Sequence, residues 1–348
     1  MNIQKVDSLN APHLENQFSY SGLDLWMNFV NKMYKHRIHR FIATENNQTC
    51  GALSLIEIKH PIFGHYLATA PFGSYGGFAF ENESAKNKLL ESATQLAREI
   101  EAEYVSIRFD ESASSPSFDK LRTPPANWIQ HPAYLTYLID LPANSEDLLK
   151  KFSSDHRNHI RKSLKKGFQI RFGHLDLLDD AYEAIAKSMH ELGSPYHSKT
   201  YLKKMAEHLG DTLEFAVTYD SRGKISGGGV FIVQDKTIFN LHANVLRFAR
   251  SNYAGEFLYW SVIEHAINKG LSTFDLGRSL IGSGNDIFKS KWSPQKRQLS
   301  YWYWLAKGNE VPSLNQKSPK FQFAIAVWKR LPSFVVRMLG PFVIRGLV

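Results

Sequence analysis

One stretch near the end of the chain, residues 274–304, combines glycines with polar and basic side chains that could do chemistry. Asp275 is expected at the end of a strand, where a carboxylate can accept a proton. Lys289 is a cation that could stabilise a developing negative charge or hold a substrate phosphate. The other polar side chains of the loop are candidates for substrate binding: Arg278, Ser279 and Asn285. The stretch therefore indicates a site that attracts an anion.

Each of these residues also has a structural interpretation. Asp275 could cap its loop or pair with Arg278, and Arg278 could instead form a salt bridge with Asp286. Lys289 could be a solvated surface lysine. His242, near the end of another predicted strand, is a candidate general base, although a histidine within a strand is often a hydrogen-bonded core residue. The sequence leaves both interpretations open for each residue.

Regular elements must position this loop. A predicted helix over 253–268 and a strand over 273–276 precede it, and an aromatic strand over 299–305 follows it. Loops that leave the carboxyl end of a strand often carry sites, because the scaffold is rigid while the loop is free to carry polar groups. Tyr259, within the preceding helix, could contact a substrate or pack in the core.

A second basic region falls on one predicted helix, residues 145–166. Arg157, Arg161 and Lys165 recur every four residues, which places them on one face of a helix. This face could bind the phosphates of a nucleic acid or a precursor pyrophosphate, or it could be a solvated surface. Another face of the same helix is expected to be buried and carries Leu148, Phe152, Ile160 and Leu164.

The composition is that of an ordinary globular protein, with 43% hydrophobic and 22% charged residues among 348. The net charge of +9 favours anionic partners such as phosphates, nucleic acid or an acidic membrane surface. The single cysteine excludes an internal disulfide, and the scattered histidines show no metal-ligand spacing, so no metal is expected. Residues 1–18 do not resemble a secretory signal, and no apolar run approaches the roughly 20 residues that span a bilayer. We therefore expect a cytoplasmic protein.

Alternating strand and helix patterns indicate two similar α/β halves. The first half has predicted helices at 23–34 and 84–100 and strands at 40–44, 51–58, 66–70, 104–109 and 133–140. The second has predicted helices at 145–166, 177–192, 198–209 and 253–268 and strands at 168–172, 213–219, 228–233, 237–243, 273–276 and 299–305. The serine- and proline-rich segment 110–127 is expected to be a surface loop. The predicted domains are 1–142, 143–306 and 307–348.

The last of these segments, 307–348, differs from the rest. From residue 319 on, it mixes apolar residues with lysines and arginines, and Pro332 and Pro341 interrupt it, so it is too broken to span a membrane. Two interpretations fit this pattern: a pair of short helices packed on the body, or an amphipathic segment in peripheral contact with an anionic membrane. Amphipathic helices usually face a core, which favours packing.

Together these motifs resemble the FemAB-like branch of the GNAT acyltransferase superfamily. They are most similar to FemAB-related proteins of bacterial exosortase (PEP-CTERM) and exopolysaccharide systems, which have a BioF2-like acetyltransferase domain. The residues that carry the resemblance are Tyr259-Trp260, FDLGRS at 274–279, Gly284, Phe288-Lys289 and Trp292. Weaker matches are LGSP at 192–195, HRNHIRKSLKKG at 156–167 and APFGSYGG at 70–77. The resemblance covers most of the chain.

The resemblance implies an α/β (α+β) fold of two GNAT-like domains, each with a mixed, mostly antiparallel sheet flanked by helices. It implies an enzyme that transfers an acyl or aminoacyl group to an amine, with Lys289 at the position of a lysine that lies in the family's substrate site. In FemAB enzymes the donor is an aminoacyl-tRNA and the acceptor is the peptide of a peptidoglycan precursor. No cofactor is fixed by the resemblance, and the donor is either aminoacyl-tRNA or acyl-CoA.

Two positions depart from the family patterns. GNAT enzymes that use acetyl-CoA usually carry R/Q-x-x-G-x-G/A before the helix that follows the central strand. This chain has RSNYAGEF there, with Gly255 as its only glycine, which argues against an acyl-CoA donor. The glycine that usually follows the tryptophan of the FK..WG motif is Ser293.

Three functions follow from these observations. The leading hypothesis is a FemAB-like acyltransferase that acts on an amine of an anionic peptidoglycan or exopolysaccharide precursor, with a site between the halves lined by Arg278, Ser279 and Lys289. An acetyl-CoA-dependent N-acetyltransferase is a variant of it. The second hypothesis is a non-catalytic binder of an anionic glycolipid or membrane surface. The third is an RNA-binding protein, which ranks last because the chain lacks an RNP-type aromatic motif.

Overall fold

The computed structural model describes residues 1–9, 11–15, 17–110, 123–131, 134–311 and 319–347. These residues form two compact units. Unit 1 comprises Met1–Thr136, Arg297–Ser313 and Arg345–Val348, and unit 2 comprises Tyr137–Lys296 and Leu314–Ile344. The units differ from the predicted boundaries, because the aromatic strand predicted at 299–305 pairs within the sheet of unit 1. Much of the predicted loop at 110–127 lies outside the described residues.

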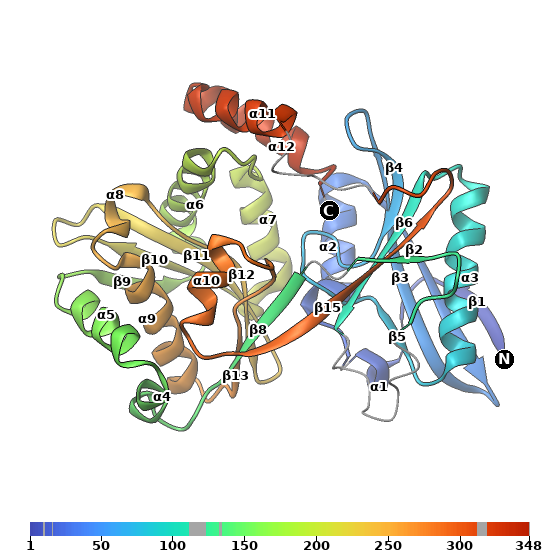
Figure 1. Ribbon diagram of the computed structural model, residues 1–348, viewed down its shortest axis with the longest axis horizontal. Helices are drawn as coiled ribbons and strands as arrows, with labels where there is room; N and C mark the ends of the chain where they lie inside the picture. The colour runs from blue at the N-terminus through green and yellow to red at the C-terminus, as the bar shows by residue number, and fades with distance from the viewer. Residues whose placement is uncertain (10, 16, 111–122, 132–133, 312–318, 348) are drawn as a thin grey trace. The chain divides into compact units, whose positions relative to one another are not determined.

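Unit 1 is built on a mostly antiparallel sheet (Figure 1). Its strands, in spatial order, are β1 (Asn2–Val6), β2 (Arg37–Glu45), β3 (Gln48–His60), β4 (Gly64–Ala68), β6 (Tyr104–Asp110) and β15 (Gln295–Leu305). Two short strands pair beside this path, β5 (Phe78–Phe80) with β3 and β7 (Ile129–Gln130) with β15. The β4–β6 pair is parallel, and helix α3 (Glu83–Glu99) forms the connection that a parallel pair requires.

Helix α3 supplies one side of the unit 1 core. The Asn82 side chain accepts a hydrogen bond from the Ala85 N–H and so caps the start of the helix. Leu89 and Ala93 are buried on its inner face, in the same cluster as Trp302 of β15. The smaller helical elements of this unit are α1 (Pro12–Glu15), a 3₁₀ turn at Tyr20–Gly22 and α2 (Asp24–Tyr34).

Unit 2 is built on a second mixed sheet. Its strands, in spatial order, are β9 (Gln169–Gly173), β10 (Leu213–Tyr219), β11 (Ile225–Gln234), β12 (Thr237–Val245), β13 (Thr273–Asp275) and the end of β8 (Tyr134–Asp140). The β12–β13 pair is parallel, and the other neighbours are antiparallel. β11 is buried along most of its length, which requires cover on both faces of the sheet.

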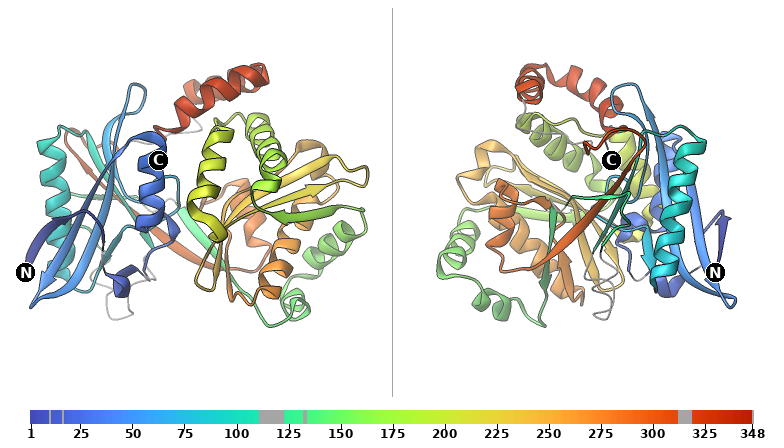
Figure 2. Two further views of the ribbon diagram at one scale, coloured as in Figure 1. Left: turned by 180° about the vertical axis from the view of Figure 1, so that it is seen from behind. Right: turned by 45° about the vertical axis from the view of Figure 1, so that its right-hand side comes forward.

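Helices supply this cover. α6 (Leu178–Leu192) and α7 (Lys199–Leu209) lie on one face, and α5 (Ser154–Leu164) and α9 (Ala254–Asn268) lie on the other (Figures 1 and 2). Gly228 of β11 allows the close approach of α6, because a Cβ at this position would lie 3.0 Å from the Ala184 Cβ. The shorter elements of unit 2 are α4 (Ser145–Lys151), α8 (Arg247–Arg250), β14 (Ser279–Leu280) and α10 (Gly284–Ser290).

The single helix predicted over 145–166 is wrong, because the chain forms α4 and α5 with a break at Phe152–Ser153. Ser153 is extended, and its Oγ accepts a hydrogen bond from the His156 N–H, so it starts a new helix. The break changes the phase of the buried face. Ile160 is buried as predicted, whereas Leu164 is 48% exposed.

The tail forms two helices, α11 (Pro319–Arg330) and α12 (Ser333–Ile344), which belong to unit 2. Arg337 of α12 forms an ion pair with Glu183 of α6. Gly340 lies so close to Tyr196 that a Cβ there would be 2.8 Å from the Tyr196 carbonyl oxygen. Among the described residues, the helices are all too short or too polar to cross a membrane.

Candidate functional site

Strand β12 has an edge that is only partly paired. β11 pairs with β12 from Thr237 to Val245, whereas β13 pairs with it only from Thr237 to Phe239. A β-bulge lies just beyond the end of the β12–β13 pairing. The register shows it: Val230 pairs with His242, and the next residue, Phe231, pairs with Asn240. Bulges often occur beside active sites. From Asn240 onward, the other edge of β12 therefore has no partner strand within the described part of the chain.

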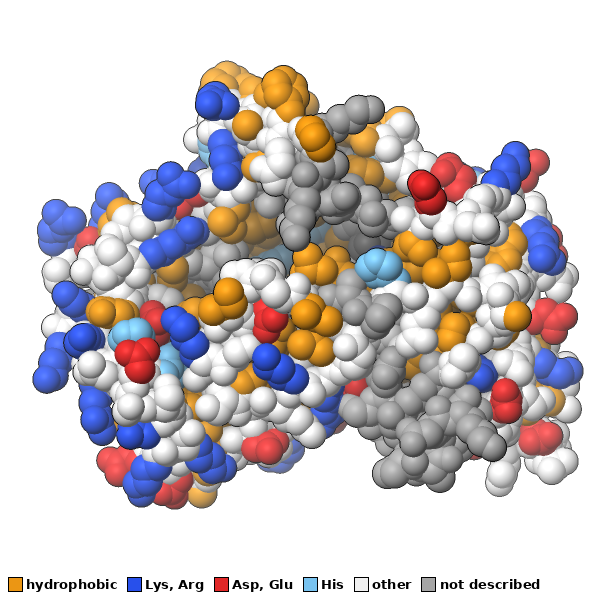
Figure 3. Space-filling model, viewed as in Figure 1, with side chains coloured by type: hydrophobic (Ala, Val, Ile, Leu, Met, Phe, Trp, Pro, Cys, Tyr) orange, Lys and Arg blue, Asp and Glu red, His pale blue; other side chains and the backbone are white. Residues whose placement is uncertain are grey.

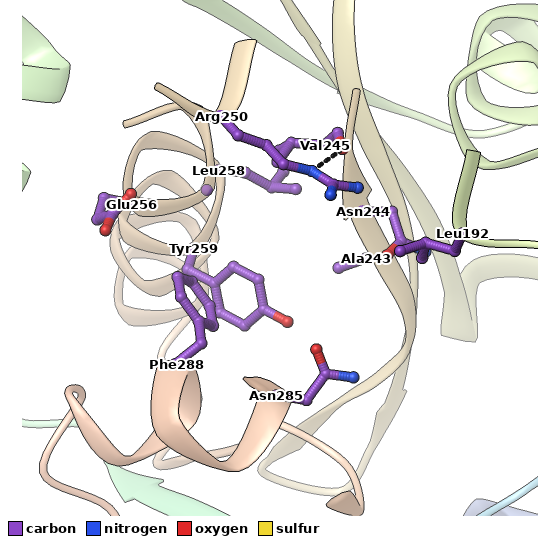
Figure 4. A pocket seen from close by; sticks show the side chains of 11 residues that line it. Leu192, Ala243, Asn244, Val245, Arg250, Glu256, Leu258, Tyr259, Asn285 and Phe288 are labelled. Atoms are coloured by element: carbon purple, nitrogen blue, oxygen red, sulfur yellow. Dashed lines mark hydrogen bonds between the residues drawn. The ribbon is translucent and has the colours of Figure 1, made fainter. Parts of the chain in front are cut away.

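A cavity of about 340 Å³ lies beside this edge, as Figure 4 shows. This volume is within the range of small-molecule sites. Most of the lining residues come from the end of β12, the first turns of α9 and one side of α10, and α6 and α8 each supply one more. The lining residues are Leu192, Ala243, Asn244, Val245, Arg250, Gly255, Glu256, Leu258, Tyr259, Asn285 and Phe288.

Tyr259 presents a hydroxyl group to this cavity. Figure 4 shows the hydroxyl directed into the open space, on the same side as Asn285. The Asn240 side-chain amide donates a hydrogen bond of 2.9 Å to the tyrosine oxygen, so the phenol proton is not used in this contact. Burial raises the pKa of Tyr259, which keeps the group protonated near neutral pH. Tyr259 can therefore act as a hydrogen-bond donor or a proton donor to a bound ligand.

The start of α9 forms a part of the cavity wall that can bind an anion. Backbone N–H groups in the first turn of a helix attract negative charge, and Gly255 lies in that turn. The exposed Arg250 adds a cation, and its Nε donates to the Val245 carbonyl at 3.2 Å. Glu256 is also in the first turn, but Figure 4 shows it on the side of the helix away from the open space.

Lys289 lies inside the structure and not on its surface. The side chain is only 7% exposed, and its Nζ donates to the carbonyl oxygens of Gly277 and Arg278 at 2.9 and 3.0 Å. Burial lowers the pKa of Lys289 to about 7, and the nearby Asp275 carboxylate partly opposes this shift. The alternative interpretation of Lys289 as a solvated surface lysine is therefore wrong. Lys289 joins α10 to the loop that follows β13.

Asp275 belongs to the same cluster. It is 1% exposed, and its Oδ1 accepts a hydrogen bond of 2.7 Å from the Gly277 N–H. Gly277 has a φ of +75°, and a Cβ there would lie 3.0 Å from the Asn240 carbonyl oxygen, so this turn requires glycine. Asp275 thus caps its loop, as the structural interpretation expects. Ser279 nearby has a buried Oγ with no hydrogen-bond partner among the residues that the structure describes.

Asp286 holds the other end of this loop. Its carboxylate accepts from the Gly282 N–H at 2.8 Å and from the Ser290 hydroxyl at 3.0 Å. These bonds, together with Tyr137, stabilise the ionised form and lower the pKa of Asp286 to about 2. The loop is therefore fixed at both ends, and α10 presents Asn285 to the cavity.

The residues predicted for the site divide into three groups. Tyr259 and Asn285 line the cavity. Asp275, Arg278, Ser279 and Lys289 form the loop cluster beside α10 and are absent from the cavity lining. The other three predicted residues, His242, Arg157 and Arg161, lie elsewhere in unit 2.

His242 sits one residue before the cavity-lining Ala243. Its ring packs against Tyr196 at 5.2 Å, and burial lowers its pKa to about 4. Arg157 and Arg161 line a different hollow, of about 520 Å³, together with Lys150. Arg157 also donates to the Phe152 carbonyl, which fixes it across the break between α4 and α5.

Sequence reasoning missed Asn240, Arg250 and the open edge of β12. The polar residues of this strand follow the pattern Asn240, His242, Asn244, which could have indicated a polar strand end. The sequence offers no comparable signal for the unpaired edge, because strand pairing depends on where β13 ends.

Comparison with known proteins finds one family model that matches part of unit 2. Residues 150–290 match the model of the acetyltransferase (GNAT) domain, and this segment contains every residue that lines the cavity. No curated protein matches the chain.

Among solved structures, the chain is similar to FemX, at 14% identity over 93% of this chain and 100% of that one, with a TM-score of 0.65. It is similar to the C-terminal domain of a putative lysylphosphatidylglycerol synthetase from Agrobacterium fabrum, at 15% identity over 86% and 91%, with a TM-score of 0.54. It is also similar to a tandem GNAT protein from the clavulanic acid biosynthesis pathway, at 11% identity over 89% and 100%, with a TM-score of 0.55.

At these identities the solved structures establish the fold. They confirm the predicted class, two GNAT-like domains with mixed, mostly antiparallel sheets flanked by helices. The matched domain supports the predicted GNAT acyltransferase activity, and the fold of FemX agrees with the predicted resemblance to the FemAB-like branch.

Proposed function

We propose that unit 2 binds an activated acyl or aminoacyl donor in the cavity beside β12 and transfers the acyl group to an amine. The main support for this proposal is the position of the cavity. It lies beside the unpaired edge of β12 and the start of α9, and the Tyr259 hydroxyl points into it. An extended donor arm can add hydrogen bonds to the free strand edge. The acyl carbonyl then lies within reach of the tyrosine.

The reaction needs few groups from the protein. The neutral amine attacks the carbonyl carbon, a C–N bond forms, and the bond from that carbon to the leaving sulfur or oxygen breaks. The amine loses a proton to the solvent, and the Tyr259 hydroxyl donates to the leaving atom and is then reprotonated. Holding donor and amine together supplies much of the rate.

In this proposal Lys289 acts through the loop and not by contact with the substrate. Its two hydrogen bonds hold the carbonyl groups of Gly277 and Arg278 beside α10, which carries the cavity residues Asn285 and Phe288. Arg278 and Ser279 remain candidates for binding the acceptor, since they lie in the loop that Lys289 fixes.

The donor is either aminoacyl-tRNA or acyl-CoA. Both carry phosphates and an activated carbonyl, and both suit a cavity with Arg250 and a helix start in its wall. A donor that binds the folded protein raises its Tm, so acetyl-CoA or an aminoacyl-tRNA should protect the purified protein against thermal unfolding. A non-catalytic binder of glycolipid would gain no protection from either donor.

We further propose that the acceptor is an anionic cell-envelope precursor, of peptidoglycan or exopolysaccharide, and that the protein meets it from the cytoplasmic side as a peripheral membrane protein. The tail helices support this proposal, because Phe323, Phe334 and Met338 are 73%, 72% and 67% exposed. Figure 3 shows hydrophobic and basic side chains together over α11 and α12. Apolar side chains beside cations suit an anionic bilayer surface.

Flotation with vesicles tests the membrane contact. The full chain should float with vesicles that contain phosphatidylglycerol and should remain at the bottom with neutral phosphatidylcholine vesicles. Combining Phe323→Ser, Phe334→Ser and Met338→Ser should abolish flotation, whereas Ile62→Ser, which removes a residue of unit 1 that is 60% exposed, should not. Equal flotation of the triple variant and the unmodified protein would show that α11 and α12 do not make the membrane contact.

A further inference from the structure

We propose that His156, His159 and Glu256 form a binding site for a divalent transition metal ion such as Zn²⁺. One ligand atom from each residue lies within 4.8 Å of the other two. Ligand atoms on one zinc ion lie roughly 3–4 Å apart, because Zn–N and Zn–O bonds measure about 2 Å, so small side-chain rotations complete the site. Two imidazoles and one carboxylate are a donor set that zinc accepts.

His156 provides the strongest support. Its side chain is 1% exposed, and both of its ring nitrogens are buried without a hydrogen-bond partner among the described residues. A buried polar atom without a hydrogen-bond partner destabilises the folded state. Trp292 packs edge-on against the ring, with centroids 4.5 Å apart, and holds it in place without satisfying either nitrogen. A bound metal ion would satisfy one of them.

His159 is one helical turn further along α5. Its Nε2 lies 3.5 Å from an oxygen of Asp155, and its Nδ1 is buried without a partner among the described residues. This division of roles is typical of metal-binding histidines, in which one nitrogen binds the ion and a carboxylate orients the other. Tyr253 packs against the ring in a tilted arrangement, with the two ring centroids 4.8 Å apart.

Glu256 supplies the negative charge that a divalent ion needs. It is 9% exposed, and within the described part of the chain no hydrogen bond or ion pair engages its carboxylate. Lys291 lies near His156 and opposes a cation there. The carboxylates of Glu256 and Asp155 offset this charge. A bound ion would join α5 to the first turn of α9, next to the cavity.

Another cluster in the chain shows why unused nitrogens matter. In unit 1, Glu57 accepts hydrogen bonds from His39 and His65, at 2.9 and 3.1 Å, and pairs with Lys59 at 3.1 Å. Both of its carboxylate oxygens are therefore already engaged by neighbouring side chains. The His156 cluster lacks such internal bonds.

Metal titration of the full chain tests this proposal without reference to catalysis. Protein that has been treated with a chelator and dialysed should bind one equivalent of Zn²⁺ at micromolar concentration in isothermal titration calorimetry. Co²⁺ should give the visible absorption of an ordered site. His159→Ala and Glu256→Gln should each weaken Zn²⁺ binding at least about tenfold, since even the loss of an outer partner costs 10–100-fold.

His65→Ala is the matched control, because it removes a histidine whose Nε2 is already hydrogen-bonded, and it should bind Zn²⁺ as the unmodified chain does. Far-ultraviolet circular dichroism should show that all variants are folded. The proposal is overturned if the unmodified protein binds no Zn²⁺ at micromolar concentration, or if His159→Ala and Glu256→Gln bind it as tightly as the unmodified chain.

Discussion

Replacing Tyr259 with phenylalanine should lower kcat/KM for acyl transfer by about 10²–10³-fold, the effect of removing one hydrogen bond that stabilises developing charge. The variant keeps the ring, which packs against Phe288 and Trp292 at centroid distances of 5.1 and 5.8 Å, so it should fold. The loss falls on catalysis because the hydroxyl is the part of the side chain that Figure 4 shows in the cavity. Transfer is measured as loss of the acyl group from the donor in the presence of an amine.

Tyr219→Phe is a matched control for this experiment. Its hydroxyl donates to Asp180 at 2.6 Å and is not part of the cavity wall, so its removal should leave kcat/KM nearly unchanged. Full transfer activity in a folded Tyr259→Phe variant would contradict the role proposed for the hydroxyl.

Replacing Lys289 with methionine should flatten the pH dependence of stability above neutral pH. The folded protein holds Lys289 at a pKa of about 7, against the ordinary lysine value of 10.5. Between these values the unfolded chain binds more protons than the folded chain, so raising the pH through this window stabilises the fold. Lys289 can contribute at most about 1.4 kcal/mol per pH unit to this rise, and below the window its burial cost applies in full.

Denaturant unfolding at a series of pH values measures this contribution as the difference between the unmodified protein and Lys289→Met. As the pH falls towards 7, the unmodified protein should lose stability through Lys289, and Lys289→Met should not lose it. The free energy of unfolding of the variant should therefore rise relative to that of the unmodified protein. Lys203→Met, at an exposed position on α7, should follow the unmodified protein throughout. Parallel curves for the unmodified protein and Lys289→Met would show that the lysine titrates as it does in the unfolded chain.

The sequence predicts elements well where the pattern is local. The helix predicted at 84–100 forms as α3, because an asparagine cap and a regular apolar face determine it. The break between α4 and α5 was missed because Ser153 is a weaker signal than the continuous pattern of charges around it. The wrong prediction that Leu164 is buried follows from that error.

The site was harder to predict because its parts meet only in the folded chain. The charges of Asp275 and Lys289 make them the leading candidates, yet both are buried and bonded to the loop. Tyr259, for which the sequence favours core packing, reaches the cavity. The contact of α5 with the start of α9 brings His156 and His159 close to Glu256. Spacing along the chain gives no sign of such a contact.

If the cavity beside β12 holds the acyl donor, a donor should raise the Tm of the protein only while the cavity is open. We would measure the Tm with and without donor in the unmodified chain and in Ala243→Trp, which places a large ring in the cavity wall. A donor at about 100 times its Kd adds about 2.7 kcal/mol to the stability of the folded state.

We expect acetyl-CoA or an aminoacyl-tRNA to raise the Tm of the unmodified protein. The same donor should raise the Tm of Ile281→Trp, a control at a half-exposed position outside the cavity lining, and should leave that of Ala243→Trp unchanged. A Tm that responds to neither donor in the unmodified protein, or that rises equally in Ala243→Trp, would contradict this expectation.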